Sequence, residues 1–377
     1  MSSAAPAYHV LPSKWYAGAA LDIPYQAGVQ VQFRISADVS LAQTHDGPVM
    51  LNKHAILLAA SMLPGTICCQ LLAADTETQP KLQVIQTGNG YEFLEGKSSV
   101  LFYQTVPKSL DGKFERAGYV HPLYDLDANV ISEDFPADHL HHRGIFWAWH
   151  QLTVDGNQVG DPWICRDFLS RVDNVTIAKR SSDAAAIEAT AYWVSPDWKD
   201  SAGTMKPMVR EETRIEVRRS GGNSRTIDFR IKLTALEAEI YIGGSDDIKG
   251  YGGFSPRLRL PADIRFTAEY GEVEPQRTAV KASRWMDISG TFNKQKSDQE
   301  NVVDGVTILC HPSLPGFPQK WILRKARSMQ NPVFPGRVPI ALPTKEPLEL
   351  RYRLIVHRGV ASHEQLKLWF DKYAAEE

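Results

Sequence analysis

Hydrophobic and polar residues alternate with a period of two along several segments of the chain. The clearest segments are residues 29–35, 213–217, 226–233, 263–266 and 348–354. Such alternation is typical of strands that bury one face. Turn-forming clusters separate these segments, at residues 88–90, 155–157, 220–223 and 243–247. Many short strands between turns predict an all-β sandwich or barrel.

One helix is predicted after residue 361. Ser362 and Gln365 have the spacing of a capping box, in which the hydroxyl of the first residue accepts from the backbone of the second. Leu366, Phe370 and Tyr373 then recur at helical spacing, together with Trp369. We expect this apolar stripe to dock on the sheet. Residues 54–62 form a second candidate helix, although their apolar residues run continuously rather than as a stripe.

Composition and charge narrow the class of protein. The 377 residues carry 42 basic and 44 acidic side chains, a net charge of −2 that gives no electrostatic attraction to nucleic acid or anionic membranes. The longest apolar run, residues 55–63, is far below the roughly 20 residues of a membrane span, and no signal-peptide pattern opens the sequence. We therefore expect a cytoplasmic protein with a β extension at residues 1–95 packed on a main domain at residues 96–377.

Cysteine spacing argues against disulfide or zinc scaffolds. Cys68 and Cys69 are adjacent, and Cys165 and Cys310 stand alone without a CxxC pair. We expect buried, reduced thiols.

Histidines and carboxylates are concentrated between residues 119 and 144. Four of the eleven histidines fall there: His121, His139, His141 and His142. In one interpretation His139 and His141 share a face of an extended segment and ligate a metal, with Asp138 as a further ligand or as a hydrogen-bond partner of a ligand. In a second, a histidine is a general acid or base and Arg143 holds a sugar oxygen. In a third, the histidines are hydrogen-bonded structural residues.

Tryptophans follow this cluster directly. Trp147 and Trp149 stand two residues apart, so they point to the same side of a strand, and Trp163 follows. Their indole faces suit sugar rings, and core packing is the alternative.

Other residues are weaker candidates. Glu211 and Glu212 face opposite sides of a strand, so one of them at most lines a given cleft, and carboxylate-assisted glycoside cleavage needs a pair. Lys249 lies in a glycine-rich segment and His311 before a proline-rich loop. The sequence contains no GxGxxG, GxSxG or HExxH motif, so no nucleotide cofactor is expected.

Five phrases of the sequence, at residues 119–124, 133–144, 249–254, 311–312 and 351–359, together resemble the bacterial PmoA-like family of unknown function. The resemblance runs from about residue 100 to 360, with Leu140 where the family usually has proline. A "methane oxygenase" label attached to that family does not fit a sequence without membrane helices. The resemblance implies a galactose-mutarotase-like β-supersandwich that binds carbohydrate on a curved sheet, with a short C-terminal helix here.

The sequence therefore predicts a carbohydrate-active enzyme that cleaves a small glycoside by hydrolysis or elimination. Elimination from a keto-glycoside needs only a histidine base, because the keto group makes the neighbouring proton acidic. An epimerase or mutarotase, and a non-catalytic sugar-binding protein, remain alternatives. The predicted catalytic residues are His141, His142, Arg143, Glu211, Lys249 and His311. The predicted substrate contacts are His121, Asp138, Trp147, Trp149 and Trp163, and a divalent metal at His139 and His141 stays open. The expected partner is a small carbohydrate, and an oligomer is compatible with the sequence.

Overall fold

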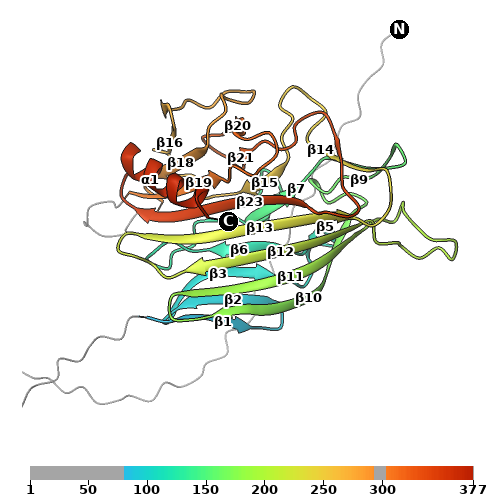
Figure 1. Cartoon of the computed structure of the whole chain (residues 1–377), viewed down its shortest axis with the longest axis horizontal. Helices are drawn as coiled ribbons and strands as arrows, with labels where there is room; N and C mark the ends of the chain where they lie inside the picture. Colours follow the sequence, from blue (N-terminus) through green and yellow to red (C-terminus); the bar gives the residue numbers. More distant parts are fainter. Residues whose placement is uncertain (1–79, 293–302, 377) are drawn as a thin grey trace, which may run out of the picture. The chain divides into compact units, whose positions relative to one another are not determined.

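Antiparallel strands dominate the computed structural model, which describes residues 80–292 and 303–376 (Figure 1). The chain divides into the units Met1–Leu72 and Ala73–Glu377, and everything below concerns the second. The predicted strand at residues 29–35, the candidate helix at 54–62, Cys68 and Cys69 lie outside the described residues.

The largest sheet has nine antiparallel strands. Along it β12 and β13 alternate buried and partly exposed side chains, as their sequence pattern predicts. The predicted strand at 263–266 forms two residues later, as β16. The strand order is β10 (Leu169–Arg180), β11 (Ala184–Val194), β12 (Val209–Arg218), β13 (Ser224–Ala235), β23 (Leu348–Arg358), β19 (Asp304–Cys310), β18 (Trp285–Gly290), β16 (Arg265–Ala268) and β17 (Gly271–Glu272).

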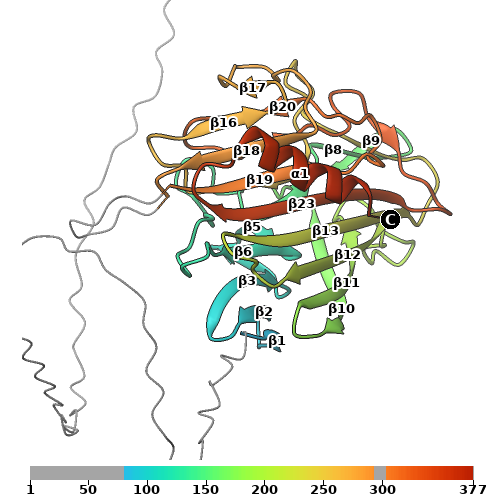
Figure 2. The same ribbon diagram turned by 60° about the vertical axis from the view of Figure 1, so that its left-hand side comes forward.

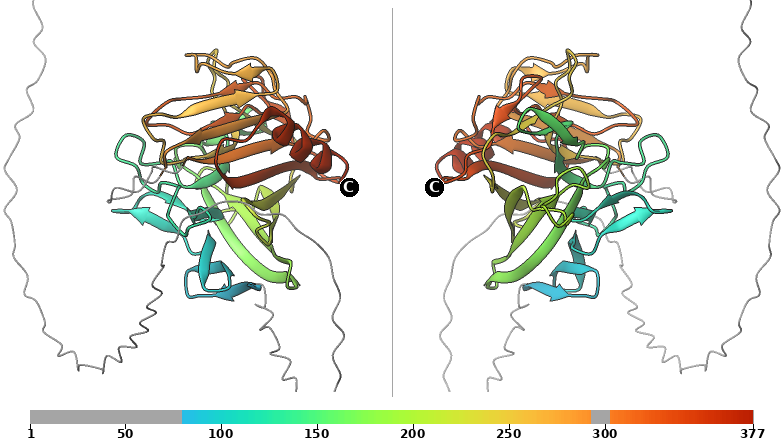
Figure 3. Two further views of the ribbon diagram at one scale, coloured as in Figure 1. Left: turned by 90° about the vertical axis from the view of Figure 1, so that its left-hand side faces the viewer. Right: turned by 90° about the vertical axis from the view of Figure 1, so that its right-hand side faces the viewer.

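A six-stranded sheet packs against this one. Phe254 stacks on Tyr352 with ring centroids 4.5 Å apart, and Trp147 meets Phe229 edge-on, so apolar residues of both sheets form one core. Figure 3 shows the blue and cyan strands of the smaller sheet beside the green strands of the larger. The order is β1 (Leu82–Gln86), β2 (Gly90–Glu95), β3 (Ser98–Gln104), β6 (Tyr119–Leu123), β7 (Ile145–Ala148) and β15 (Gly253–Pro256).

Strands in the segments that connect the strands of the two large sheets form smaller sheets. The four-stranded sheet is ordered β22 (Ile340–Ala341), β14 (Ile240–Gly243), β8 (Gln151–Val154) and β9 (Asn157–Gly160). Two short pairs are β20 (Trp321–Ile322) with β21 (Asn331–Pro332), and β4 (Lys108–Leu110) with β5 (Lys113–Arg116).

Helix α1 (His363–Ala374) covers the other face of the nine-stranded sheet at β18, β19 and β23 (Figure 2). Its Leu366, Phe370 and Tyr373 are buried, as predicted. The Ser362 hydroxyl accepts from the Gln365 backbone N–H at 3.1 Å, which confirms the predicted cap.

The prediction of an all-β sandwich with a short C-terminal helix is confirmed. No helix among the described residues is long and apolar enough to cross a membrane. Within the predicted extension, β1 and β2 pair in one sheet with β3. The remainder of that extension lies in the residues that are not described, so the domain boundary at residue 95 stays a prediction. Cys310 is buried and Cys165 half-buried, and both are free thiols.

Replacing Ser362 with Ala removes the cap of α1 and leaves the Gln365 N–H without its acceptor. We expect the free energy of unfolding to fall by about 1 kcal/mol, measured by urea denaturation. Ser362→Thr keeps a capping hydroxyl and is the control. A loss of equal size in both variants would contradict the capping role.

Candidate functional site

The segment that carries the histidines forms a turn. The His139 N–H donates to the Pro136 carbonyl at 3.0 Å, and the His142 N–H donates to the His139 carbonyl at 2.9 Å. The expectation of an extended segment with His139 and His141 on one face is therefore wrong. Successive three-residue hydrogen bonds curl the chain and gather three imidazoles instead.

The three imidazoles are in mutual contact. His139 and His142 stack with centroids 4.7 Å apart and planes 4° from parallel. His141 stands edge-on to both, at 5.7 Å and 4.7 Å. We call His139, His141 and His142 the histidine triplet.

A buried arginine holds this turn from a distant part of the sequence. Arg257, just after β15, is 2% exposed and donates to Asp138 at 2.8 Å and to Glu133 at 2.7 Å. The second oxygen of Asp138 lies 2.7 Å from Nδ1 of His139. A carboxylate only accepts hydrogen bonds, so Nδ1 of His139 carries the proton and Nε2 keeps its lone pair when the ring is neutral.

His142 has the opposite tautomer. Its Nδ1 lies 3.3 Å from Nη1 of Arg257, and a guanidinium only donates, so Nδ1 accepts and Nε2 carries the proton. Burial, followed by the charges of His141 and His139, lowers the pKa of His142 far below its usual range. His142 is therefore a neutral donor at Nε2, and it lies beside His139, whose neutral form accepts at Nε2.

His141 has no hydrogen bond to any described residue and is partly exposed. Burial, with smaller contributions from His139 and Arg116, lowers the pKa of His141 to about 4. The ring is thus neutral at physiological pH, and a ligand can reach its nitrogens.

Aromatic rings extend the triplet into a row. Trp163 meets His142 edge-on at 5.9 Å, stacks on His150 at 5.4 Å and touches Tyr251 at 4.9 Å. Asp161 fixes the orientation of His150 through Nδ1 at 3.0 Å. His150 Nε2 is buried without a hydrogen-bond partner among the described residues.

The row ends at a cleft of about 910 Å³. Ala279 and Val333 pack against the cluster of Trp163 and Tyr251 and also line the cleft. Lys249 lines it too, with Nζ 3.0 Å from Asp247 and 5.1 Å from the Tyr251 ring centroid. The predicted Lys249 is thus close to the row, but an acid already pairs with it.

Backbone packing explains the glycine-rich segment beside this cleft. A Cβ on Gly244 would lie 2.2 Å from the Gly250 carbonyl oxygen, and one on Gly250 would lie 2.7 Å from the Arg337 nitrogen. Only glycine allows these loops to approach so closely.

Arg143 is an internal brace. Its side chain is fully buried and donates to Asp134, to the Tyr119 hydroxyl and to the carbonyls of Lys108 and Phe114. With its donors occupied in the interior, Arg143 is not placed to hold a sugar oxygen. None of the hydrogen-bond partners of Arg143 takes over the predicted role of holding a sugar oxygen.

Trp147, Trp149 and Glu211 belong to the core between the sheets. Trp147 and Trp149 share a side of the chain as predicted, but they are 5% and 0% exposed. The indoles of Trp147 and Trp193 donate to Glu211 at 2.9 and 2.8 Å, and burial raises the Glu211 pKa. Odd-numbered positions in and directly after β7 face the core, which is why Trp147 and Trp149 do not join the histidine triplet.

The remaining predicted residues lie apart. His311 contacts the end of α1, with Nε2 3.1 Å from the Glu376 carbonyl and its ring against Tyr373. His121 on β6 lies 2.9 Å from the Ser132 hydroxyl, and burial lowers its pKa to about 4. Neither residue makes a ring contact with the triplet.

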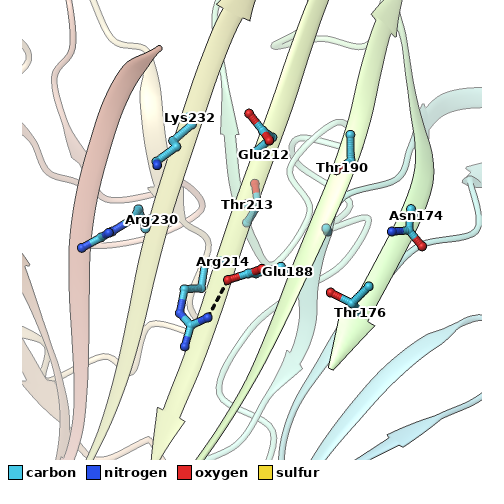
Figure 4. Close-up of a pocket in the computed structure, with 10 residues that line it drawn as sticks. Asn174, Thr176, Glu188, Thr190, Glu212, Thr213, Arg214, Arg230 and Lys232 are labelled. Carbon is cyan, nitrogen blue, oxygen red and sulfur yellow. Dashed lines mark hydrogen bonds and ion pairs between the residues drawn. The ribbon is translucent and has the colours of Figure 1, made fainter. Parts of the chain in front are cut away.

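A second depression lies on the outward face of the nine-stranded sheet (Figure 4). It measures about 350 Å³ and is lined by charged and hydroxyl side chains of β10 to β13. Arg214 pairs with Glu188 at 2.6 Å and with Glu216 at 2.8 Å, and Lys232 lies 3.5 Å from Glu349. Its charges neutralise one another, as on an ordinary solvated sheet face.

Within residues 80–292 and 303–376, no group of three or more His, Cys, Asp or Glu side chains is arranged to hold a metal ion. The metal at His139 and His141 gains no support from this geometry and stays a prediction.

The chain belongs to the family of unknown function DUF6807, whose model matches residues 91–370. No curated protein matches the sequence.

Three solved structures are similar in fold class alone. The galactose 1-epimerase of Lactobacillus acidophilus NCFM is 10% identical, with 74% of this chain and 100% of that chain covered and a TM-score of 0.35. A putative mutarotase (YeaD) of Salmonella typhimurium is 9% identical over 74% and 92%, with a TM-score of 0.30. The GalM/aldose epimerase homologue of C. elegans is 7% identical over 75% and 100%, with a TM-score of 0.29.

Sequence reasoning did not select Arg257, His150, Asp161 or Tyr251. His150 directly follows the tryptophan segment and Tyr251 lies inside the glycine-rich segment, so the sequence motifs could have indicated both residues. Arg257 had no local signal, because its partners lie more than a hundred residues away.

Replacing Arg143 with Gln leaves Asp134 buried without its guanidinium partner. We expect a loss of about 3–5 kcal/mol in the free energy of unfolding, measured by urea denaturation. Arg180→Gln, at an exposed end of β10, is the matched control and should change it by less than about 0.5 kcal/mol. A stable Arg143→Gln protein with altered sugar affinity would restore the predicted binding role.

The lowered pKa of His141 also makes stability depend on pH. The folded state binds this proton less tightly than the unfolded state, whose imidazole titrates near 6.5. The contribution of His141 is therefore complete above pH 6.5 and is lost as the pH falls toward 4. We expect a smaller loss of stability over that window in His141→Gln, measured by urea denaturation at each pH. Identical profiles for both proteins would contradict the shift.

Proposed function

We propose that this protein is a carbohydrate-active enzyme in which the histidine triplet transfers protons. The observation that carries the proposal is the pair of opposite tautomers, His139 held by Asp138 and His142 held by Arg257. One neutral ring offers a lone pair at Nε2 and its stacked neighbour offers an Nε2–H, so a base and a donor stand side by side.

Asp138 and Arg257 orient the two rings, and neither needs to touch the substrate. Asp138 fixes the His139 tautomer and stabilises the imidazolium that forms after proton abstraction. Arg257 favours the ionised form of Asp138, and its hydrogen bond to Nδ1 fixes the orientation of the His142 ring. His139 has a side-chain exposure of 43%, so the base faces solvent.

The carboxylates near the triplet do not support hydrolysis by a carboxylate pair. Asp138 is bound by Arg257 and His139, and Asp161 by His150 and by two backbone amides. Glu211, the carboxylate selected from the sequence, lies in the core. Histidine chemistry suits elimination from a keto-glycoside better.

In that reaction His139 removes the proton on the carbon between the keto group and the anomeric carbon. The electron pair forms the carbon–carbon double bond, the glycosidic C–O bond breaks, and the leaving oxygen takes up the proton that His139 now holds at Nε2, while His142 donates a hydrogen bond to that oxygen from its Nε2–H. Every proton and electron pair is accounted for by the two rings and the substrate. Carbohydrate as the substrate class rests on the resemblance of the sequence to the PmoA-like family.

Interconversion of anomers would use the same base and donor, on the anomeric hydroxyl and the ring oxygen. It is therefore the second candidate, and the product formed separates the two. A binding protein would leave the substrate unchanged.

We expect the purified full chain to convert a 3-keto-glycoside, followed through its anomeric proton NMR signal. His139→Gln should lower the rate by about 10²–10⁴-fold, because proton transfer loses its base. Asp138→Asn should shift the pH optimum, since an amide cannot fix the tautomer or balance the imidazolium. His363→Gln, an exposed histidine on α1, is the control with unchanged rate.

Circular dichroism of each variant separates loss of chemistry from loss of fold. Exchange of anomers without cleavage would establish the second candidate. An unchanged rate in folded His139→Gln protein would remove the triplet from the mechanism.

A further inference from the structure

The charged side chains that line the 910 Å³ cleft are all cationic. Among the described residues around it they are Lys249, Lys281, Lys320 and Arg337, and no acid belongs to the lining. Two of the four form ion pairs with acids outside the lining, Lys249 with Asp247 at 3.0 Å and Arg337 with Asp246 at 2.9 Å.

Lys281 and Lys320 have no ion-pair partner among the described residues. The Nζ of Lys281 lies 4.8 Å from the centroid of the Tyr270 ring, a contact that leaves its positive charge uncompensated. Both lysines are exposed. The cleft thus keeps two unbalanced positive charges in its wall.

The two lysines lie beside the same backbone bridge. Val280 and Trp321 form an isolated antiparallel bridge, and Lys281 and Lys320 are each the chain neighbour of one of these residues in the cleft wall. Like charges on neighbouring positions of paired segments destabilise the pairing. A favourable anion between them would offset that repulsion.

The same strands connect the lysines to the row of rings. Val333, which donates its N–H to the Lys320 carbonyl at 2.9 Å, packs against the cluster of Trp163 and Tyr251. Ala279, two residues before Lys281, packs against the same cluster. The segments that carry the two lysines therefore pack against the row of rings that begins at the histidine triplet.

Apolar side chains stand at the edge of this cleft. Ile248, in the lining, is 80% exposed, and Val338, next to Arg337, is 76% exposed. The wall thus combines cations with apolar surface, which suits a sugar ring that carries one charged group.

We propose that Lys281 and Lys320 bind an anionic group of the substrate, so that the carbohydrate is an acidic one: a sugar bearing a carboxylate or a phosphate. Ammonium groups form short, charge-assisted hydrogen bonds to either. The sugar part rests on the proposed function, whereas the anion site does not.

The test is calorimetric titration of the full chain with glucose, glucuronate, glucose 6-phosphate and inorganic phosphate, at low and high salt. Glucuronate and glucose 6-phosphate should bind about tenfold or more tightly than glucose, and salt should weaken them selectively. The tighter of the two acidic sugars identifies the anionic group as a carboxylate or a phosphate.

The double variant Lys281→Gln/Lys320→Gln should abolish the preference for acidic sugars and leave glucose binding unchanged. Without ligand its unfolding midpoint should equal or exceed that of the original protein, because the repulsion is gone. Lys97→Gln/Lys372→Gln removes two exposed lysines elsewhere and is the matched control.

Equal affinity for charged and neutral sugars, or a preference that survives in the double variant, overturns the anion site. If no sugar binds, phosphate binding that is lost in the double variant supports the anion site. If phosphate does not bind either, the anion site is overturned. Turnover of a neutral keto-glycoside without charge preference would leave the proposed function standing and remove the anion site. Lysine-dependent anion binding without any turnover would support the anion site and count against the proposed function, so the two failures are distinct.

Discussion

Arg257 places a full positive charge in the interior, where it is 2% exposed, and the geometry of the histidine turn follows from how that charge is satisfied. Its guanidinium binds Glu133, Asp138 and Nδ1 of His142. Its backbone N–H donates to the Gly144 carbonyl, and its own carbonyl accepts from the Glu133 N–H. A buried ion is tolerated only when its partners are held in place, so this residue ties the turn before β7 to the end of β15.

The functional consequence is an ordered set of imidazoles. An arginine that only donates and a carboxylate that only accepts force opposite tautomers on two stacked rings. Burial keeps the pKa values of His141 and His142 low, so these two rings are neutral at physiological pH rather than a repelling pair of cations. In the proposed mechanism the base and the donor are therefore oriented before a substrate binds.

The residues that stabilise the sandwich and those proposed to react are separated by the two faces of β7. Ile145 and Trp147 enter the core between the sheets, where Trp147 also satisfies Glu211. Phe146 and Ala148 face the opposite side and join the cluster of Trp163. Gly144 makes this possible, because a Cβ there would lie 2.0 Å from the Val120 carbonyl oxygen, and its φ of 54° suits glycine. The tight approach of β6 and β7 delivers the turn to the row of rings.

The alternating pattern of β12, β13 and β23 and the cap at Ser362 were readable from the sequence, since strand alternation and helix capping are local. The concentration of functional side chains at residues 138–142 was readable too, because it lies in one short segment. The roles within it were not. Arg143 is a brace and Arg257 the orienting cation, because charge compensation depends on which distant acids share the interior. The same holds for Glu211, whose indole partners come from β7 and β11, and for Lys281 and Lys320, which line one cleft only after the segments that carry them pair. Local propensity fixed the strands and the helix; only the packing of sheets and loops decided which polar groups meet.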